Sequence, residues 1–179
     1  MDKDRRQQLI DCGPDALADA LLNLAVHSVE VDDLIEQLIA TPKENLSRFK
    51  RKLSGLKRRT RFIDWRESAS FARELELLLQ DLKSGVDDPL IGVELVAAFY
   101  EADNTIFKMC DDSSGNIGDV FRYDAKELFV DYAKRCSDKE KNADIILKVN
   151  QKDNYGIRDT LIDCAGECLP EGIIRTMIA

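Results

Sequence analysis

The sequence predicts an all-α protein of stacked antiparallel helix pairs, and three observations support this. Each of the four prolines stands where a helix should begin, the position at which its missing N–H costs nothing. Between these starts, apolar residues recur with helical spacing. No segment alternates apolar and polar residues over a convincing strand length, and the nearest, Thr60–Trp65, is short. We therefore expect about eight helices in an α-solenoid-like or irregular helical array.

The first expected helices span 14–27, 30–40 and 42–58, after an N-terminal arm over 1–13. Pro14 opens the first helix, and Thr41 and Glu44 have capping-box spacing at the start of the third. A fourth helix is expected over 65–83, where Asp64 and Glu67 repeat an N-terminal signal.

Asp88 and Pro89 then predict a helix over 89–110 whose two apolar faces place it centrally, between neighbouring helices. Helices over 119–136 and 138–149 follow, with a short terminal pair within 155–178. The connections are short, as in antiparallel helix pairs, and the pairs Asp19–Leu38 and Phe129–Val149 resemble each other weakly, as repeats would. We expect one helical domain over 14–179. Because Ala179 lies in an apolar helix without a cap, we also expect further chain or a partner element beyond it.

Composition bounds the class of protein. The 179 residues are 44% hydrophobic and 34% charged, which is ordinary for a globular chain. No apolar run approaches the roughly 18 residues of a membrane span, and the polar Met1–Gln8 is no secretory signal. Five cysteines without such a signal indicate reduced thiols, so we expect a cytoplasmic protein without a membrane partner.

Charge is unevenly distributed in a chain of formal net charge −8. Residues 43–66 contain ten basic and two acidic residues, whereas 11–36 contain seven acidic residues and neither Lys nor Arg. The candidate partner-binding residues are Lys50, Arg51, Lys57, Arg58, Arg59 and Arg61. They would bind phosphates, in a helix-turn-helix formed by 30–40 and 42–58, or an acidic protein. The alternative, which we favour, is that the acidic helices neutralise the basic one internally.

The polar run Asp111–Asp119 resembles a calcium loop if Gly115 is its invariant glycine. Asp112, Ser114 and Asn116 then occupy ligand positions, but Cys110 and Phe121 replace the first and last ligands. A capped turn between helices explains the same residues, with Ile117 in the core, and is the interpretation we favour.

Other candidate chemistry is weak. Cys164 and Cys168 have helical i, i+4 spacing, but half a zinc site is poor evidence, and buried small side chains explain them better. The single histidine, His27, is expected at a helix C-terminus, where a positive charge is favourable. No nucleophile or phosphate-loop motif occurs, so an enzyme is unsupported, and no cofactor or metal is expected.

Five aromatic residues at helical spacing are expected in the core rather than along a ligand groove. They are Phe62, Trp65, Phe71, Tyr100 and Phe107.

Two segments of the chain resemble a known family. One is Arg61-Phe62-Ile63-Asp64-Trp65, and the other is the run from Asp111 to Phe121; Asn154-Tyr155-Gly156-Ile157 and Glu171-Gly172-Ile173 follow. In this order they resemble an uncharacterised bacterial family of all-helical, helical-repeat-like proteins, some of them associated with a SWIM-type zinc finger. The resemblance covers roughly residues 14–179 and implies a helical fold without an assigned activity. This chain lacks the zinc-finger ligands.

The sequence thus favours a non-catalytic scaffold with an unknown protein partner, since helical arrays offer extended binding surfaces. The alternative is a nucleic-acid-binding protein that uses the basic segment 43–66. An enzyme with an unrecognised carboxylate site is third.

Overall fold

The computed structural model describes residues 2–178 and confirms the all-α prediction, because within these residues every regular element is a helix. The elements are α1 (Asp2–Asp11), α2 (Pro14–Ala25), α3 (Val29–Ile39), α4 (Pro42–Leu56), α5 (Ser68–Gly85), α6 (Pro89–Tyr100), α7 (Asp103–Lys108), α8 (Asn116–Asp119), the π-helix η1 (Val120–Ala125), α9 (Lys126–Arg135), α10 (Lys139–Asn150), α11 (Asp159–Asp163), α12 (Ala165–Cys168) and α13 (Glu171–Ile178). Extended pairing is limited to one isolated bridge, between Ile63 and Cys110.

The chain divides into two compact units, Met1–Ala40 (unit 1) and Thr41–Ala179 (unit 2). Unit 1 contains α1 and a hairpin in which α2 packs against α3. The expected boundary after residue 13 lies inside unit 1, and a single domain over 14–179 stays a prediction.

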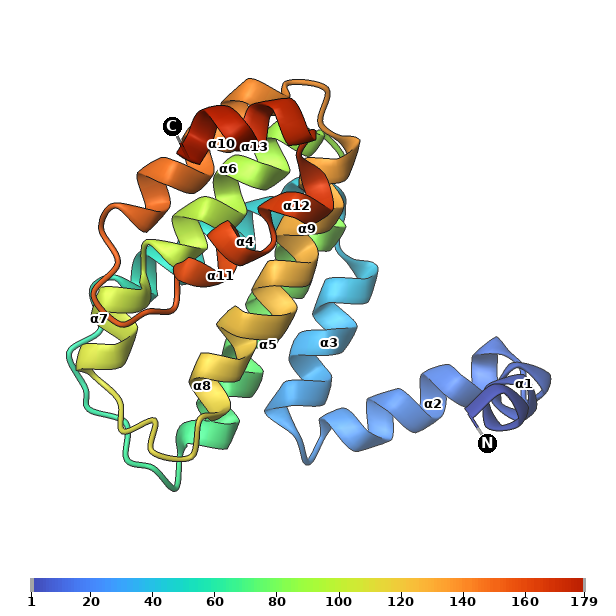
Figure 1. Ribbon diagram of the computed structural model, residues 1–179. Helices are drawn as coiled ribbons and strands as arrows, with labels where there is room; N and C mark the ends of the chain where they lie inside the picture. The colour runs from blue at the N-terminus through green and yellow to red at the C-terminus, as the bar shows by residue number, and fades with distance from the viewer. Residues whose placement is uncertain (1, 179) are drawn as a thin grey trace. The chain divides into compact units, whose positions relative to one another are not determined.

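The core of unit 2 forms where α4, α5, α6 and α9 pack in sequence against one another. Figure 1 shows α6 and α9 near the centre of this unit, with the orange and red C-terminal helices beside them. Phe49, Leu75, Val96 and Phe129 are fully buried there. The apolar periodicity of the sequence therefore identifies the buried faces of these helices correctly.

The predicted long helix over 89–110 is wrong, because the chain turns after Tyr100 and forms two helices. The Ala102 N–H donates to the Phe99 carbonyl at 3.0 Å, which tightens the chain into a turn before α7 begins at Asp103. Asp103 is fully buried and ion-paired, so the turn places a carboxylate where its partner can reach it.

In place of the single predicted helix over 119–136, α8, η1 and α9 follow one another without a break, and the hydrogen bonding changes to the π-helical pattern in η1. The Tyr100 hydroxyl donates to the Phe121 carbonyl at 2.7 Å, so a side chain uses a backbone acceptor within the π-helical segment. A side chain that takes up a backbone acceptor in this way is a recognised cause of local change in the hydrogen-bond pattern of a helix. The predicted terminal pair within 155–178 is instead three short helices, α11 to α13.

One glycine sets how closely α6 and α9 approach. A Cβ atom at Gly92 would lie 2.3 Å from Cδ1 of Tyr132, a separation that real Cβ contacts do not show. The Tyr132 hydroxyl donates to the Val86 carbonyl at 2.9 Å, which fixes the ring over the glycine. Only glycine permits this contact without displacing the ring.

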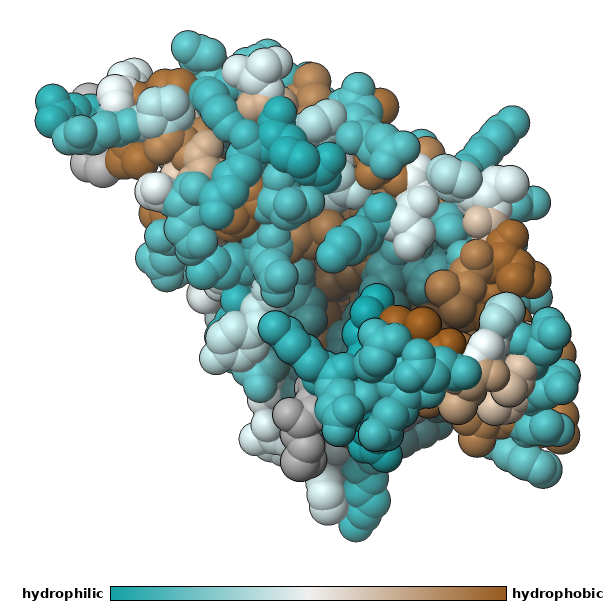
Figure 2. Space-filling view, turned by 90° about the vertical axis from the view of Figure 1, so that its right-hand side faces the viewer, coloured by the Kyte–Doolittle hydropathy of each residue, from teal (hydrophilic) through white to brown (hydrophobic). Residues whose placement is uncertain are grey.

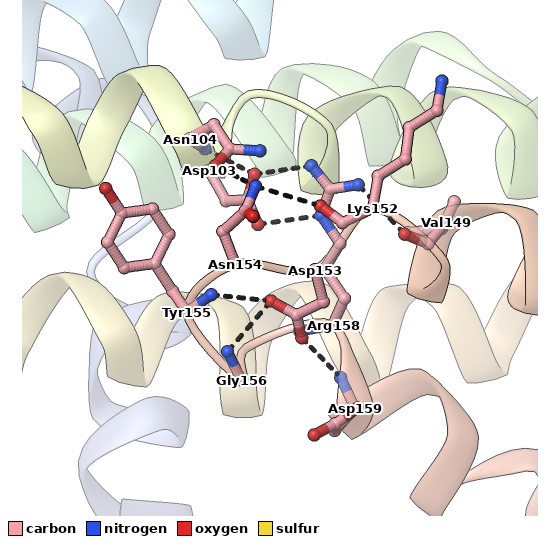
Figure 3. Close-up of polar contacts among 10 residues, drawn as sticks. All are labelled: Asp103, Asn104, Val149, Lys152, Asp153, Asn154, Tyr155, Gly156, Arg158 and Asp159. Carbon is pink, nitrogen blue, oxygen red and sulfur yellow. Dashed lines mark hydrogen bonds and ion pairs between the residues drawn. The ribbon is translucent and has the colours of Figure 1, made fainter.

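A buried ion pair connects α7 to the segment before α11 (Figure 3). The Arg158 guanidinium donates to both carboxylate oxygens of Asp103, at 2.6 and 2.8 Å, and to the Val149 carbonyl at 2.9 Å. Both side chains are almost wholly inaccessible to solvent, with 2% exposed for Arg158 and 0% for Asp103. The bidentate geometry satisfies charges that would otherwise be costly to bury.

Asp153 organises the loop that delivers Arg158. Its carboxylate accepts backbone N–H bonds from Tyr155, Gly156, Arg158 and Asp159 at 2.8 to 3.2 Å (Figure 3). Burial by itself raises the pKa of Asp153, but these four donors outweigh it and hold the pKa below its ordinary value. The loop is thus built around an ionised carboxylate.

Four of the five thiols are buried, and the prediction that Cys164 and Cys168 are buried small side chains is confirmed. Burial raises the pKa of Cys110 to about 11 and that of Cys164 to about 12. Cys12 is exposed. Because the thiolate is the reactive form, burial protects these thiols sterically, and the raised pKa values of Cys110 and Cys164 protect those two by protonation as well.

Removing one partner of the buried ion pair should strongly destabilise the protein. We expect Arg158→Met to lower the free energy of unfolding by about 3 kcal/mol or more, because it leaves the Asp103 carboxylate buried without its partner. The measurement is urea denaturation followed by circular dichroism. Arg175→Ala, which removes an exposed pair with Glu171, should change stability by no more than about 0.5 kcal/mol. Equal effects of the two variants would contradict this interpretation.

A thiol reagent should distinguish Cys12 from the other cysteines. We expect the native protein to react rapidly at one thiol per chain and the denatured protein at all five. The readout is the absorbance released by a disulfide reagent at pH 8. Cys12→Ser should abolish the rapid phase, and a rapid phase that survives this change would refute the assignment.

Candidate nucleic-acid interface

Basic side chains lie along the outer face of α4. The helix begins with the predicted capping box, in which the Glu44 N–H donates to Thr41 Oγ1 and the Thr41 N–H donates to the Glu44 carboxylate. Its inner face buries Phe49, Leu53 and Leu56. The opposite, exposed face contains the residues that we call the basic face: Lys43, Lys50, Arg51, Lys57 and Arg58, the last two at the helix end.

The basic face follows from helical geometry. Lys43, Lys50 and Lys57 are spaced by seven residues, about two turns or 10 Å of helix, so they fall on one side. Within the described chain, no residue of the basic face forms an ion pair with a carboxylate; the Arg58 Nε donates to the Ser54 carbonyl at 3.2 Å. Their charge is therefore directed to solvent.

The remaining basic residues of segment 43–66 have acidic partners. Arg48 is buried and donates to Asp81 at 3.0 Å, and Lys52 lies 4.0 Å from the same carboxylate. Arg59 pairs with Glu74 at 3.1 Å, and Arg61 pairs with Glu67 at 2.6 Å. The segment is thus partly neutralised by carboxylates of α5 and by Glu67 directly before it. Of the six predicted partner-binding residues, four form no ion pair with a carboxylate in the described chain, and two, Arg59 and Arg61, are paired.

The loop after α4 is held by its central residue. Ile63 is 1% exposed, its N–H donates to the Met109 carbonyl at 2.7 Å, and its carbonyl accepts from the Asp111 N–H at 2.9 Å. This is the bridge to Cys110, and it makes the loop locally extended. Because side chains alternate across an extended segment, burying Ile63 turns its neighbours outward.

This geometry corrects the prediction for two of the five aromatic residues. Phe71 and Tyr100 are buried as expected, whereas Phe62 and Trp65 are 59% and 51% exposed. Ile63 takes the core position next to Phe62, whereas Trp65 lies in the turn before α5. The short alternation at Thr60–Trp65 is the sequence signal that could have revealed the exposure of Phe62.

Ser68, at the start of α5, fixes the other end of the loop. Its hydroxyl donates to the Trp65 carbonyl at 2.7 Å and lies 2.9 Å from the Ser114 hydroxyl. The Asn116 side-chain amide donates to Ser68 Oγ at 3.0 Å. We call residues 59–67, held at Ile63 and Ser68, the aromatic loop.

The candidate calcium residues make protein contacts of a different kind. Asp112 accepts the N–H groups of Ile117 and Gly118 at 2.9 and 2.8 Å, as a cap of α8 does. Ser114 and Asn116 bind Ser68, Gly115 has a φ of +78°, and Ile117 is fully buried. These contacts are those of the capped turn that the sequence favoured. Within the described residues, no group of three or more His, Cys, Asp or Glu side chains could hold a metal ion.

A shallow hollow of about 310 Å³ lies at the aromatic loop. It is lined by Arg59, Arg61, Ile63, Arg66, Glu67, Ser70, Phe71 and Glu74. The Arg59 guanidinium lies 5.2 Å from the centre of the Phe71 ring, and that of Arg66 lies 4.7 Å from the centre of the Trp65 indole. Arginine and aromatic faces are therefore presented together at this surface.

Carboxylates gather elsewhere, along a hollow of about 290 Å³ beside α5 and α9. Glu76, Asp124, Glu127 and Asp131 line it together with Lys83. Burial and the nearby Glu76 raise the pKa of Asp124. Like-charge repulsion of this kind accompanies structural clusters as well as catalytic ones, and no nucleophile or histidine lines this hollow.

The family comparison agrees with the helical architecture. The model of a family described as "Family of unknown function (DUF6880)" matches residues 5–177. The chain belongs to this family. Searches of curated proteins and of solved structures give no significant match. DUF6880 fits the expected resemblance to an all-helical family without an assigned activity, while the SWIM-type association and the bacterial origin stay predictions. In residues 2–178, no helix combines the length and apolar character needed to cross a bilayer.

Proposed function

We propose that unit 2 binds nucleic acid through the basic face of α4. One observation carries this proposal: five basic side chains lie on the exposed side of α4 and of the turn that ends it, without carboxylate partners in the described chain. Such an arrangement is the electrostatic footprint of a phosphate-binding surface. The sequence favoured a protein scaffold because helical arrays offer extended binding surfaces, and it favoured internal neutralisation for the basic segment. The solvent-directed charge of the basic face weakens the second of these interpretations.

Local charge makes this proposal compatible with an acidic chain. Residues 43–66 carry a formal charge of +8, within a protein of −8. Because salt screens charges beyond about 8–10 Å, a phosphate bound at α4 experiences the near cationic face more than distant carboxylates. The capping box and the buried face of α4 hold the helix in place, so the charges are positioned before binding.

Nucleic-acid binding should be salt-dependent and require the basic face. We expect labelled oligonucleotides to bind the wild-type chain at low salt, with a log–log slope of about −3 to −5, as about five phosphate contacts imply. Lys50→Glu/Arg51→Glu and Lys57→Glu/Arg58→Glu should each weaken binding by about tenfold or more. Fluorescence anisotropy across a salt series provides the measurement.

A matched control is Lys134→Glu/Lys148→Glu, which makes the same change of charge at exposed positions on α9 and α10. It should retain most of the wild-type affinity. Equal loss in all three variants would indicate a response to net charge alone and contradict a site on α4. No binding by the wild-type chain at low salt would reject the proposal.

A specific observation also favours the scaffold function, through unit 1. Helix α2 buries none of its residues, and apolar side chains on α2, α3 and their connection are exposed. They include Leu22, Leu24, Val26, Val29, Leu38 and Ile39. Figure 2 shows apolar side chains reaching the surface among hydrophilic ones on the face it displays. Since 11–36 lacks Lys and Arg, the matching partner is a basic amphipathic helix.

A designed peptide tests this second candidate. A helical peptide with leucine on one face and lysine on the other should bind the wild-type chain, and Leu22→Ser/Leu24→Ser should reduce its affinity by about fivefold or more, because apolar contact area is lost. Isothermal titration calorimetry gives the affinities. Peptide binding that depends on salt but is unaffected by the two serines would refute apolar docking.

A further inference from the structure

We infer that the nucleic acid bound by unit 2 is single-stranded and that its unpaired bases stack on Phe62 and Trp65. This inference rests on the proposed function and specifies its substrate. It adds to the basic face a second surface, the aromatic loop, which recognises bases rather than phosphates.

Backbone contacts of the loop explain why Phe62 and Trp65 are exposed, and neither ring is buried in the core. The main-chain bonds of Ile63 with Met109 and Asp111 turn Phe62 to solvent, and the Ser68 hydroxyl holds the Trp65 carbonyl. Phe62 and Trp65 are therefore each more than half exposed on a loop whose backbone is fixed at its centre and at its C-terminal end. A preformed aromatic surface can accept a flat ligand at little cost in ordering.

Single strands fit this surface better than duplexes. In a duplex, the base faces are covered by neighbouring bases, and proteins reach base edges in the grooves. Unpaired bases expose their faces, and aromatic side chains beside a cationic groove are the usual means of binding them. The aromatic loop follows directly after Lys57 and Arg58 of the basic face, so one strand can contact both.

The arginines of the loop can exchange their partners for phosphates. Arg61 and Glu67 are 67% and 46% exposed, and Arg66 and Asp64 are 73% and 50% exposed. Exposed pairs of this kind are weak, so a phosphate can replace the carboxylate at small cost. The Arg66 guanidinium beside the Trp65 indole already joins a positive charge to a stacking surface.

Trp65 is the only tryptophan in the chain, so it reports on its own contact. We would titrate the full chain with an oligothymidylate about 12 nucleotides long and with the same strand annealed to its complement. The expected result is quenching of tryptophan fluorescence by the single strand and tighter binding of the single strand than of the duplex. Phe62→Ala/Trp65→Ala should weaken single-strand binding by about tenfold or more, with an unchanged salt slope because no charge is removed.

Two further variants control for folding and for general loss of aromatic area. Trp65→Phe should recover most of the affinity that the alanine pair loses. Tyr123→Ala, which removes an exposed aromatic ring from η1, should leave binding unchanged. Circular dichroism of every variant confirms that the fold is retained.

The outcomes separate the two proposals. If the basic-face variants abolish binding, but the single strand leaves the fluorescence of the wild-type chain unchanged and Phe62→Ala/Trp65→Ala binds as tightly as the wild type by fluorescence anisotropy, base stacking is wrong and the proposed function stands. Tighter binding of the duplex, with no quenching, would likewise overturn the inference. If the wild-type chain binds neither oligonucleotide at low salt, both proposals fail.

Discussion

Unit 2 depends on the requirement that a buried charge be neutralised. Asp103 lies at the start of α7 with no exposed area, and Arg158 reaches it from the far end of the sequence. Because neither charge is stable alone in the interior, the segment after α10 must return to α7. Asp153 shapes the loop that makes this return possible, through four backbone N–H donors. Burial of apolar helix faces stabilises the core, and the Asp103–Arg158 pair determines that the segment before α11 packs against the start of α7.

In the candidate interface, too, contacts between residues distant in sequence fix the position of a loop. Backbone bonds at Ile63 and the hydroxyl of Ser68 hold the aromatic loop from beneath, so its exposed side chains need no packing of their own. The polar run that resembles a calcium loop supplies part of this support through Ser114 and Asn116. A segment that looks functional in the sequence is thus structural, and the segment that it supports carries the candidate function.

Sequence reasoning succeeded where local signals decide the structure. The capping box at Thr41, the N-cap at Asp88 and the prolines mark helix starts correctly, because caps act within a few residues. It failed where distant residues decide. The turn after Tyr100 accompanies the pairing of Asp103 with Arg158, and the exposure of Phe62 follows from the bridge to Cys110. Local residue spacing reveals neither Arg158 as the partner of Asp103 nor Cys110 as the partner of Ile63. The exposed aromatic residues were therefore missed, whereas the basic residues could be read directly from the sequence.

The long-range contacts also bear on the order in which the molecule assembles. Helical proteins fold quickly when their contacts are local, since short loops close at little entropic cost. In unit 2, the contacts of Ser68 with Ser114 and of Arg158 with Asp103 instead join residues 46 and 55 positions apart. The aromatic loop reaches its final shape only after α5 and the turn before α8 have come together. During synthesis, the residues of the basic face and of the aromatic loop are therefore in place well before the partners at Met109, Asp111 and Ser114 that hold the loop have been made.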